Sequence, residues 1–269
     1  MDETNATGTG PRRVKSLQHA TAIIDALERL DGARIADLVE HVDLSKGSVH
    51  THLATLRDAG LVSKRGDQYH LGLRFVTLGE HVKENQRVYT AAKNQVDRLA
   101  AETGEYADLV VENEGFEVAL KVARGKRAME TEYHIGIEET PQYLHNSSAG
   151  KAILAHLPED RFDRILEQHG LPERTPNTIT DRETLESRLE RVRDRGYAVN
   201  DEEDIRGFRA VGAPILDSDG VPLGAISVSA PKSRLKGERF ETEVPELVMQ
   251  ATNVVEIDID TSEQGRRTE

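Results

Sequence analysis

The spacing of apolar residues changes once along this chain, and that change limits the folds open to it. Up to about Glu102, apolar residues recur every three or four positions, which is typical of amphipathic helices. From Tyr106, the segments 107–112 and 117–123 alternate apolar and polar residues, which is typical of strands. A chain of 269 residues is long enough for two domains of ~100–150 residues each. The sequence therefore predicts a helical first domain and an α+β second domain.

Residues 14–73 carry the pattern of a winged helix-turn-helix domain. The predicted elements, in order, are helices over 16–30, 34–41 and 45–59 and strands over 61–64 and 68–71. Ser45 is a good N-cap for the third helix, and Gly60 follows its end. Three short helices followed by a small hairpin with a basic tip are the elements of a winged helix-turn-helix.

The third helix of this domain is predicted to read DNA. Its apolar stripe, Val49, Leu53 and Leu56, faces the core, so the polar residues near its start face outward or lie on its flanks. Hydroxyl donors and a lysine at a helix N-terminus suit the major groove, because the amides there favour phosphate and the hydroxyls reach base edges. Together with two basic residues of the hairpin, the predicted DNA-binding residues are Ser45, Lys46, Ser48, His50, Thr51, Lys64 and Arg65. The alternative is a protein–protein module whose polar face is only solvated.

Charge is distributed unevenly along the chain. Residues 12–80 hold 10 basic and 9 acidic side chains, or +1, whereas residues 81–269 hold 25 and 37, or −12. Such asymmetry favours a nucleic-acid-facing segment attached to an acidic domain. The net charge of −13 and the low lysine content suit a protein that stays soluble in concentrated salt. An ordinary acidic protein from a GC-rich genome is the alternative.

A helix over about 74–88 is predicted to link the two domains. Linker helices of this kind often pack against their twins in a dimer, and packing within the same chain is the alternative. Residues 89–257 are predicted to form the second domain, with one mainly antiparallel sheet and a closing helix near 238–256. We expect both chain ends, 1–13 and 258–269, to be disordered.

Two sets of residues in the second domain are candidates for binding a small molecule. Ser148 and Ala149 begin a helix whose free amides and hydroxyls can bind a carboxylate or sugar acid, with N-capping alone as the alternative. Ser227 and Ser229 lie two apart in a strand, so their hydroxyls face the same side of the sheet, as either a polar pocket or a solvated face. The acidic run 200–204 could bind a cation or act as general acid or base, although such runs are more often charged loops.

Several classes of site are excluded or lack support. The absence of cysteine excludes disulfides, thiolate catalysis and cysteine-based zinc sites. The segment 148–151 matches the S-x-x-K signature of penicillin-binding enzymes, but their S-D-N and K-T-G elements are absent. His50 and His52 would diverge by ~200° on a helix, so they do not form a metal pair. We expect no catalytic residue, metal or cofactor.

No apolar run approaches the ~20 residues of a membrane-spanning helix, and no signal peptide opens the chain. We therefore expect a cytoplasmic protein with no membrane partner.

Several longer motifs, in order, resemble those of the IclR (isocitrate lyase regulator) family of transcription factors over about residues 14–257. In the first domain they are VKSL (14–17), the helix 44–56 followed by AGLV (59–62), and YHLG (69–72). In the second they are LHNSSAGKAILA (144–155), RGYAV (195–199), DEE (201–203), GFRAVGAP (207–214) and AISVSAP (225–231). The acidic, lysine-poor composition points to a haloarchaeal-type member.

The resemblance implies a winged helix-turn-helix, a linker helix and an effector domain with a GAF/profilin-like sheet. Members are typically dimers or dimers of dimers that bind palindromic operators in double-stranded DNA and respond to small metabolites. The family's ligand contacts carry over to Ser148, Ala149, Asn200, Ala210, Ser227 and Ser229. Ser148 replaces a common Gly, Asn200 a common Asp, and Ala210 a position that is Cys in some members. Thr51 stands where many relatives have Arg.

We therefore predict a ligand-responsive transcriptional regulator of a catabolic operon that binds a sugar acid or another carboxylate as a homodimer or tetramer, and not an enzyme. The alternatives are a DNA-tethered scaffold with a vestigial effector domain and, less favoured, an enzyme acting on a small acid.

Overall fold

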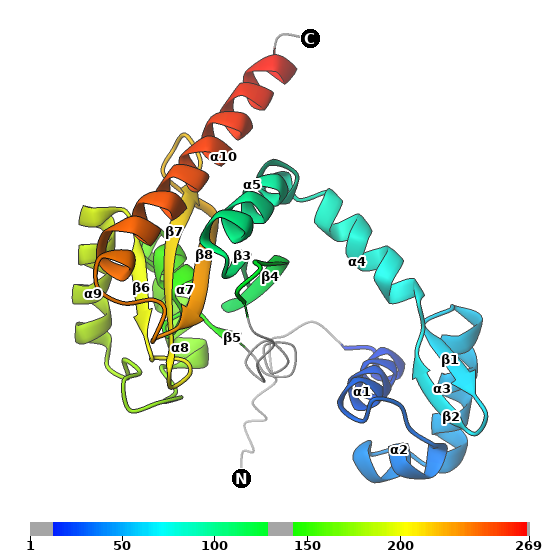
Figure 1. Ribbon diagram of the computed structural model, residues 1–269. Helices are drawn as coiled ribbons and strands as arrows, with labels where there is room; N and C mark the ends of the chain where they lie inside the picture. Colours follow the sequence, from blue (N-terminus) through cyan, green and yellow to red (C-terminus); the bar gives the residue numbers. More distant parts are fainter. Residues whose placement is uncertain (1–12, 129–141, 268–269) are drawn as a thin grey trace, which may run out of the picture. The chain divides into compact units, whose positions relative to one another are not determined.

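The computed structural model describes residues 13–128 and 142–267 and divides the chain into two compact units, 1–82 and 83–269 (Figure 1). Residues 1–12 and 268–269, part of the predicted disordered ends, lie outside the described residues. Across the described ranges, no helix is both long and apolar enough to cross a bilayer.

The first unit has the predicted winged helix-turn-helix elements. They are α1 (Lys15–Arg29), α2 (Ile35–His41), α3 (Lys46–Asp58), β1 (Val62–Arg65) and β2 (Gln68–Leu71). All three helices bury apolar side chains in a shared core, including Ile23 of α1, Leu38 of α2 and Leu53 of α3. β1 and β2 pair antiparallel, with Val62 opposite Leu71, and form the wing.

The linker helix is shorter than predicted. α4 (Arg74–Glu84) stops before Gln86, whose extended backbone (φ −82°, ψ 115°) is the N-cap of α5 (Arg87–Thr103). None of the side chains of α4 is buried, whereas α5 buries a full apolar stripe against the second unit's sheet. The helical pattern of the sequence thus continues across two separate helices.

One antiparallel sheet of six strands organises the second unit, in the order β5-β4-β3-β8-β7-β6. The strands are β3 (Tyr106–Asn113), β4 (Phe116–Arg124), β5 (Gln142–Tyr143), β6 (Ala198–Asp201), β7 (Phe208–Leu216) and β8 (Pro222–Pro231). The mainly antiparallel α+β architecture predicted from the period-two segments is confirmed.

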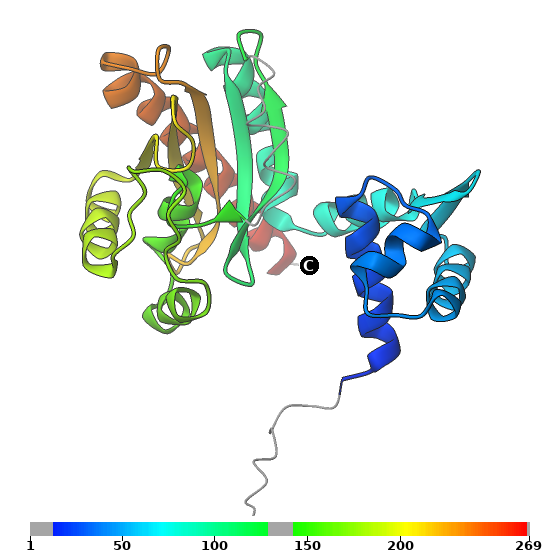
Figure 2. The ribbon, with the colours of Figure 1, turned by 90° about the horizontal axis from the view of Figure 1, so that it is seen from below.

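Helices cover both faces of this sheet (Figures 1 and 2). α5 and α10 (Val244–Arg267) lie on one face, and α7 (Ser148–Leu154), α8 (Glu159–His169) and α9 (Arg182–Arg195) lie on the other. Along β8 the side chains alternate between the faces: Ile226 and Val228 pack under α5 and α10, and Ala225 packs under α7. Ser227 and Ser229 therefore point to the α7 face, as their spacing predicted.

The predicted disordered tail from Asp258 is wrong as far as Arg267. α10 follows a short π-helical turn, Arg239–Glu243, and continues to Arg267. The apolar positions Val248, Val255 and Ile259 are spaced by seven and four residues and are buried against the sheet, so the helix stripe runs past residue 258.

Two glycines allow α7 to approach its neighbours closely. A Cβ at Gly212 of β7 would lie 2.9 Å from the nitrogen of Ala149 and from the carbonyl carbon of Ser148. A Cβ at Gly150 would lie 2.3 Å from the carbonyl oxygen of Leu144. A larger residue at Gly212 would push the start of α7 away from β7, and one at Gly150 would push it away from the backbone of Leu144.

Candidate functional site

The predicted DNA-binding residues all lie outside the core of the first unit. Ser45, Lys46, His50 and Thr51 are exposed, and Ser48 is partly buried. Lys46 and His50 are four residues apart and lie on the same flank of α3, beside its buried stripe. Two of the hydroxyls also serve the helix itself: Oγ of Ser45 accepts from the amide of Ser48 at 3.3 Å, and the hydroxyl of Thr51 donates to the carbonyl of Gly47 at 3.0 Å.

The wing presents its two basic residues to solvent. Lys64 and Arg65 are exposed at the end of β1, and Nζ of Lys64 lies 5.2 Å from the ring centroid of Tyr69. His52 is one of the polar residues of α3 that we expected to face outward or lie on a flank, and it is partly buried. Its ring packs edge-on against that of His19 of α1, with ring centroids 5.6 Å apart.

All six predicted effector-binding residues line one cavity in the second unit. They come from the start of α7, from β6, from β7 and from β8: Ser148, Ala149, Asn200, Ala210, Ser227 and Ser229. Its volume is about 30 Å³, which is room for about two water molecules. A larger ligand therefore needs the lining side chains to move.

Two neighbouring rows of residues across the sheet form the floor of this cavity. In the first row, Asn200 pairs with Ala210, which pairs with Ser229. In the second, Gly212 pairs with Ser227, which in turn pairs with Asp108 of β3. Because Gly212 has no Cβ, the first turn of α7 can lie directly above this floor.

Three carboxyl groups that the prediction missed also line the cavity: Asp108, Glu117 and Asp204. A charged residue inside the apolar run of β3 was a signal for Asp108, since it shares a sheet face with Val110. Glu117 resembles any solvated residue near a strand end, and only the pairing of β3 with β4 brings it to this face.

Burial raises the pKa of all three carboxyls, and for Asp204 the charge of Arg174 opposes the shift. Burial raises the pKa of Asp108 to about 7, opposed by a hydrogen bond with Ser227. Burial also raises the pKa of Glu117 to about 7, and the charges of Asp204 and Asp108 raise it further, against the hydrogen bond from Ser147. Near neutral pH, the carboxyls of Asp108 and Glu117 are therefore each partly protonated.

The start of α7 is held by a cap and by a buried ion pair. Oγ of Ser147 accepts from the amide of Gly150 at 2.7 Å and donates to Glu117, so Ser147 is the N-cap of α7. The side chain of Lys151 is fully buried, and its Nζ donates to Glu203. Lys151 thus ties α7 to the loop that carries Glu203.

Salt bridges and hydrogen bonds occupy the acidic run 200–204. Asp201 accepts from Arg209 at 2.6 Å, and Glu202 pairs with Lys232. Asp204 accepts from Nδ2 of Asn146 at 3.3 Å. The run is therefore a structured loop that closes one side of the cavity, and no group of three or more potential metal ligands is found in residues 13–128 and 142–267.

Threonine hydroxyls fix the backbone of this loop from outside. Oγ1 of Thr175 donates to the carbonyl of Glu202 at 2.6 Å, and Oγ1 of Thr178 donates to the carbonyl of Glu203 at 2.6 Å. Oδ1 of Asn200 accepts from the amide of Glu203 at 2.8 Å. The geometry of Glu203 towards Lys151 is therefore set by several independent hydrogen bonds.

Two oxygen atoms at the cavity have no hydrogen-bond partner: Oδ1 of Asp108 and Oγ of Ser229. Ser229 is 2% exposed. A buried polar atom without a partner costs about 1–3 kcal/mol. Their position at the cavity is what a ligand-binding site requires, since a ligand restores the missing hydrogen bonds.

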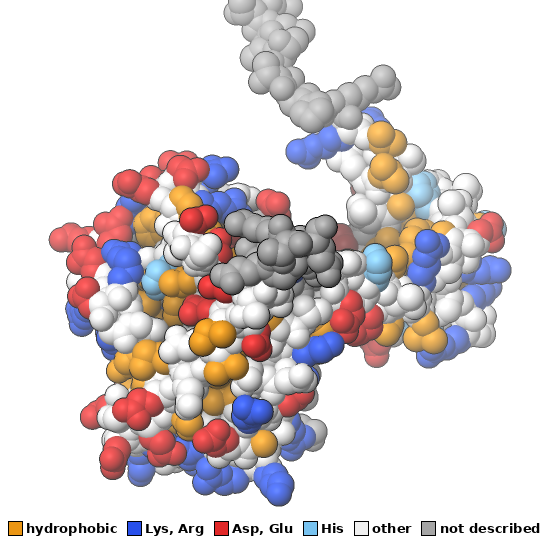
Figure 3. Space-filling view, turned by 90° about the horizontal axis from the view of Figure 1, so that it is seen from above, with side chains coloured by type: hydrophobic (Ala, Val, Ile, Leu, Met, Phe, Trp, Pro, Cys, Tyr) orange, Lys and Arg blue, Asp and Glu red, His pale blue; other side chains and the backbone are white. Residues whose placement is uncertain are grey.

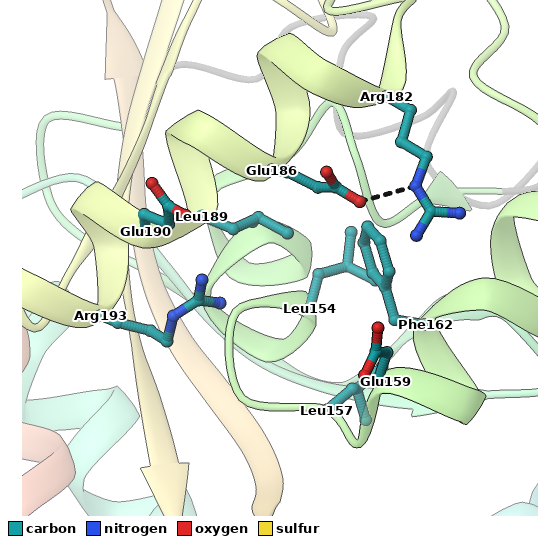
Figure 4. A pocket seen from close by; sticks show the side chains of 9 residues that line it. All are labelled: Leu154, Leu157, Glu159, Phe162, Arg182, Glu186, Leu189, Glu190 and Arg193. Carbon is teal, nitrogen blue, oxygen red and sulfur yellow. Dashed lines mark hydrogen bonds and ion pairs between the residues drawn. The ribbon is translucent and has the colours of Figure 1, made fainter.

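A separate groove between α8 and α9, of about 340 Å³, contains none of the predicted residues (Figure 4). Leu154, Leu157, Phe162 and Leu189 line it, and charged side chains surround them. On its rim, Nε of Arg182 donates to Glu186 at 2.6 Å. Nothing in it converges on a polar ligand in the way that the cavity on the sheet does.

Comparison with known proteins agrees with both halves of the molecule. Residues 16–66 match the profile described as "IclR helix-turn-helix domain", and residues 80–256 match "Bacterial transcriptional regulator IclR C-terminal". The chain belongs to the IclR family of transcriptional regulators. The resemblance predicted from the motifs is therefore confirmed.

Relatives extend the match over the full chain. The probable HTH-type transcriptional regulator ArcR of Halobacterium salinarum is 40% identical over 263 residues, which are 97% of this chain and 100% of that protein. The HTH-type transcriptional repressor AllR of Escherichia coli K12 is 31% identical over 229 residues, 84% of this chain and 83% of the repressor. The first of these is haloarchaeal, as the composition led us to expect.

Solved structures share the fold of this IclR-family chain. The Thermotoga maritima IclR has a TM-score of 0.74 at 24% identity, covering 92% of this chain and 99% of that one. An IclR homolog from Microbacterium hydrocarbonoxydans, complexed with 4-hydroxybenzoate, has a TM-score of 0.77 at 19% identity, covering 91% and 99%.

We predict that Asp108→Asn stabilises the second unit at pH 8. Between about pH 4 and 7 the native carboxyl keeps a proton that the unfolded one has lost, so the free energy of unfolding of the native protein falls as pH rises. The amide removes this loss, so the variant should gain on the order of 1 kcal/mol at pH 8 and little at pH 4. Denaturant unfolding at both pH values measures the gain. Asp219→Asn, in an exposed turn, is the control, and an equal gain at both pH values for Asp108→Asn would contradict the assignment.

Proposed function

We propose that this IclR-family regulator binds operator DNA through α3 and the wing, and that a small effector in the sheet cavity changes its affinity for that DNA. The convergence of the six predicted effector-binding residues on one cavity carries this proposal. The exposed face of α3, with Lys46 and His50, supplies the groups that would contact phosphate and bases. We place this activity in the cytoplasm, where the DNA lies.

The unpartnered oxygens of Asp108 and Ser229 favour a working effector site over a scaffold with a vestigial domain. A cavity that binds nothing would leave both groups unsatisfied at a cost to stability. The relative complexed with 4-hydroxybenzoate supports a small organic ligand for this fold. The expected catabolic operon and the expected sugar acid or carboxylate stay predictions.

We also propose that two copies associate through α4. Phe75, Leu78 and Val82 are spaced by three and four residues, so they share one face of this helix. Leu78 is 42% exposed and Val82 is 55% exposed in the single chain. A second copy of the same helix would bury this apolar stripe, in keeping with the homodimer or tetramer expected of the family.

Acidic side chains surround the second unit on the face that Figure 3 shows, with fewer basic ones between them. Such a surface repels phosphate, so contact with DNA falls to the first unit, whose charge is near balance. In molar salt, counterion release contributes little to affinity, and hydrogen bonds and shape must contribute more.

For DNA binding, we predict that Lys46→Ala and Arg65→Ala each weaken operator affinity by roughly 5- to 10-fold, because each removes a phosphate or base contact. Fluorescence anisotropy with DNA from upstream of the protein's own gene, in molar KCl, measures the change. Lys236→Ala, an exposed lysine of the second unit, is the matched control. If both first-unit variants bind as the unmodified protein does, α3 and the wing are not the DNA interface.

For assembly, we predict that Leu78→Asp with Val82→Asp raises the dimer dissociation constant at least about 10-fold, since two carboxylates would be buried in the contact. Sedimentation equilibrium measures the constant. Thr77→Asp places the same charge on another face of α4 and should leave the constant unchanged. An unaffected dimer in the double variant would exclude α4 as the contact, and a tetramer that falls to dimers would assign α4 to the second interface.

A further inference from the structure

The charge of the cavity limits the ligands it can bind. Asp108 of β3, Glu117 of β4 and Asp204 of the loop after β6 all line it. Its described lining contains no lysine, arginine or histidine. An anionic ligand would therefore meet three carboxyl groups and no compensating cation among these residues.

The basic side chains of the segments around the cavity, Lys151, Arg174 and His145, each have an ion-pair or hydrogen-bond partner. Lys151 is buried and paired with Glu203, and Arg174 lies 3.7 Å from the carboxylate of Asp204. Burial lowers the pKa of His145 to about 4, and its Nε2 lies 3.1 Å from the carbonyl oxygen of Pro172. These groups therefore do not offset the carboxyls of Asp108 and Glu117.

Of the two unpartnered oxygens, Oδ1 of an ionised Asp108 requires a hydrogen-bond donor, and the hydroxyl of Ser229 can pair with a donor or an acceptor. An ionised Asp108 is an acceptor only, and its Oδ1 has no partner. Oγ of Ser229, whose residue is 2% exposed, also lacks a hydrogen-bond partner. A ligand nitrogen with several N–H groups can donate to both atoms, whereas a ligand carboxylate offers only acceptors, which the hydroxyl of Ser229 could pair with but Oδ1 of an ionised Asp108 could not.

We propose that the effector is a small molecule with a cationic nitrogen group, which the carboxylates of Asp108 and Glu117 bind beside the hydroxyls of Ser227 and Ser229. This inference rests on the proposed function, because it names the ligand class of the same cavity. It differs from the sugar acid or carboxylate that the sequence led us to expect.

Proton exchange distinguishes the two ligand classes. Asp108 and Glu117 are partly protonated near pH 7, and Asp204 lines the cavity with them. His145, whose pKa burial lowers to about 4, and the Lys151–Glu203 pair belong to the segments around the cavity. A cation favours the ionised forms of Asp108 and Glu117, so its binding releases protons and tightens as pH rises from 6 to 8. An anion requires their neutral forms, so its binding takes up protons and weakens over the same range.

Three probes that share a two-carbon hydroxyl skeleton test this directly: ethanolamine, ethylene glycol and glycolate. Isothermal titration of the full-length protein, in two buffers of different ionisation enthalpy at pH 7, gives both affinity and proton exchange. We expect ethanolamine to bind at least 10-fold more tightly than glycolate and to release protons. Tighter binding of glycolate or ethylene glycol, or no binding of ethanolamine, would overturn the proposal.

Variants locate the site. Asp108→Asn and Glu117→Gln should each weaken ethanolamine binding about 10- to 100-fold, as expected for loss of a hydrogen bond between charged groups. Asp219→Asn, a carboxyl in an exposed turn, is the control and should bind as the unmodified protein does. Unchanged ethanolamine affinity in both cavity variants would place the binding elsewhere and overturn the proposal.

Failure of this inference is separable from failure of the proposed function. If glycolate changes operator affinity and ethanolamine does not, the regulator stands and the cationic ligand is wrong. If ethanolamine binds in the cavity with proton release but leaves operator affinity unchanged, the ligand class stands and the regulatory role is wrong.

Discussion

The buried ion pair between Lys151 and Glu203 holds together the two walls of the cavity. Lys151 lies on α7, and Glu203 lies on the loop after β6, 52 residues further along the chain. Burial lowers the pKa of Lys151, and the carboxylate of Glu203 opposes that effect. Because removal of one member of such a pair leaves a buried charge uncompensated, at a cost of about 3–5 kcal/mol, the two segments are held in one arrangement.

The position of the cavity follows from this arrangement. Glycine at 212 lets α7 lie on the sheet, the ion pair fixes the loop beside it, and the small side chains of Ala210 and Ser227 leave a space between them. The polar groups facing that space cannot all satisfy one another, as the unpartnered oxygen of Ser229 shows. A cavity whose walls are held in place around polar groups without hydrogen-bond partners is suited to respond when a ligand supplies those partners.

Local patterns in the sequence predicted most of the fold. The helical stripes of the first unit and the alternation along β8 correctly gave the winged helix and the shared face of Ser227 and Ser229, because both depend only on residue spacing. The helix beyond Asp258 was missed because charged residues surround Ile259, whose burial depends on the sheet beneath it. The carboxyl of Glu117 was missed for a related reason: its place in the cavity depends on strand pairing between distant segments.

Ligand occupancy of the sheet cavity and affinity for operator DNA should be coupled. Such a coupling is reciprocal, so it can be measured from either side. Operator affinity would be measured by anisotropy with and without saturating ethanolamine, and ethanolamine affinity with and without operator DNA. Both ratios should be equal and lie in the range of about 5–150-fold. The coupling would be excluded if ethanolamine binds, the double variant Ser227→Ala with Ser229→Ala abolishes that binding, and saturating ethanolamine still leaves operator affinity unchanged.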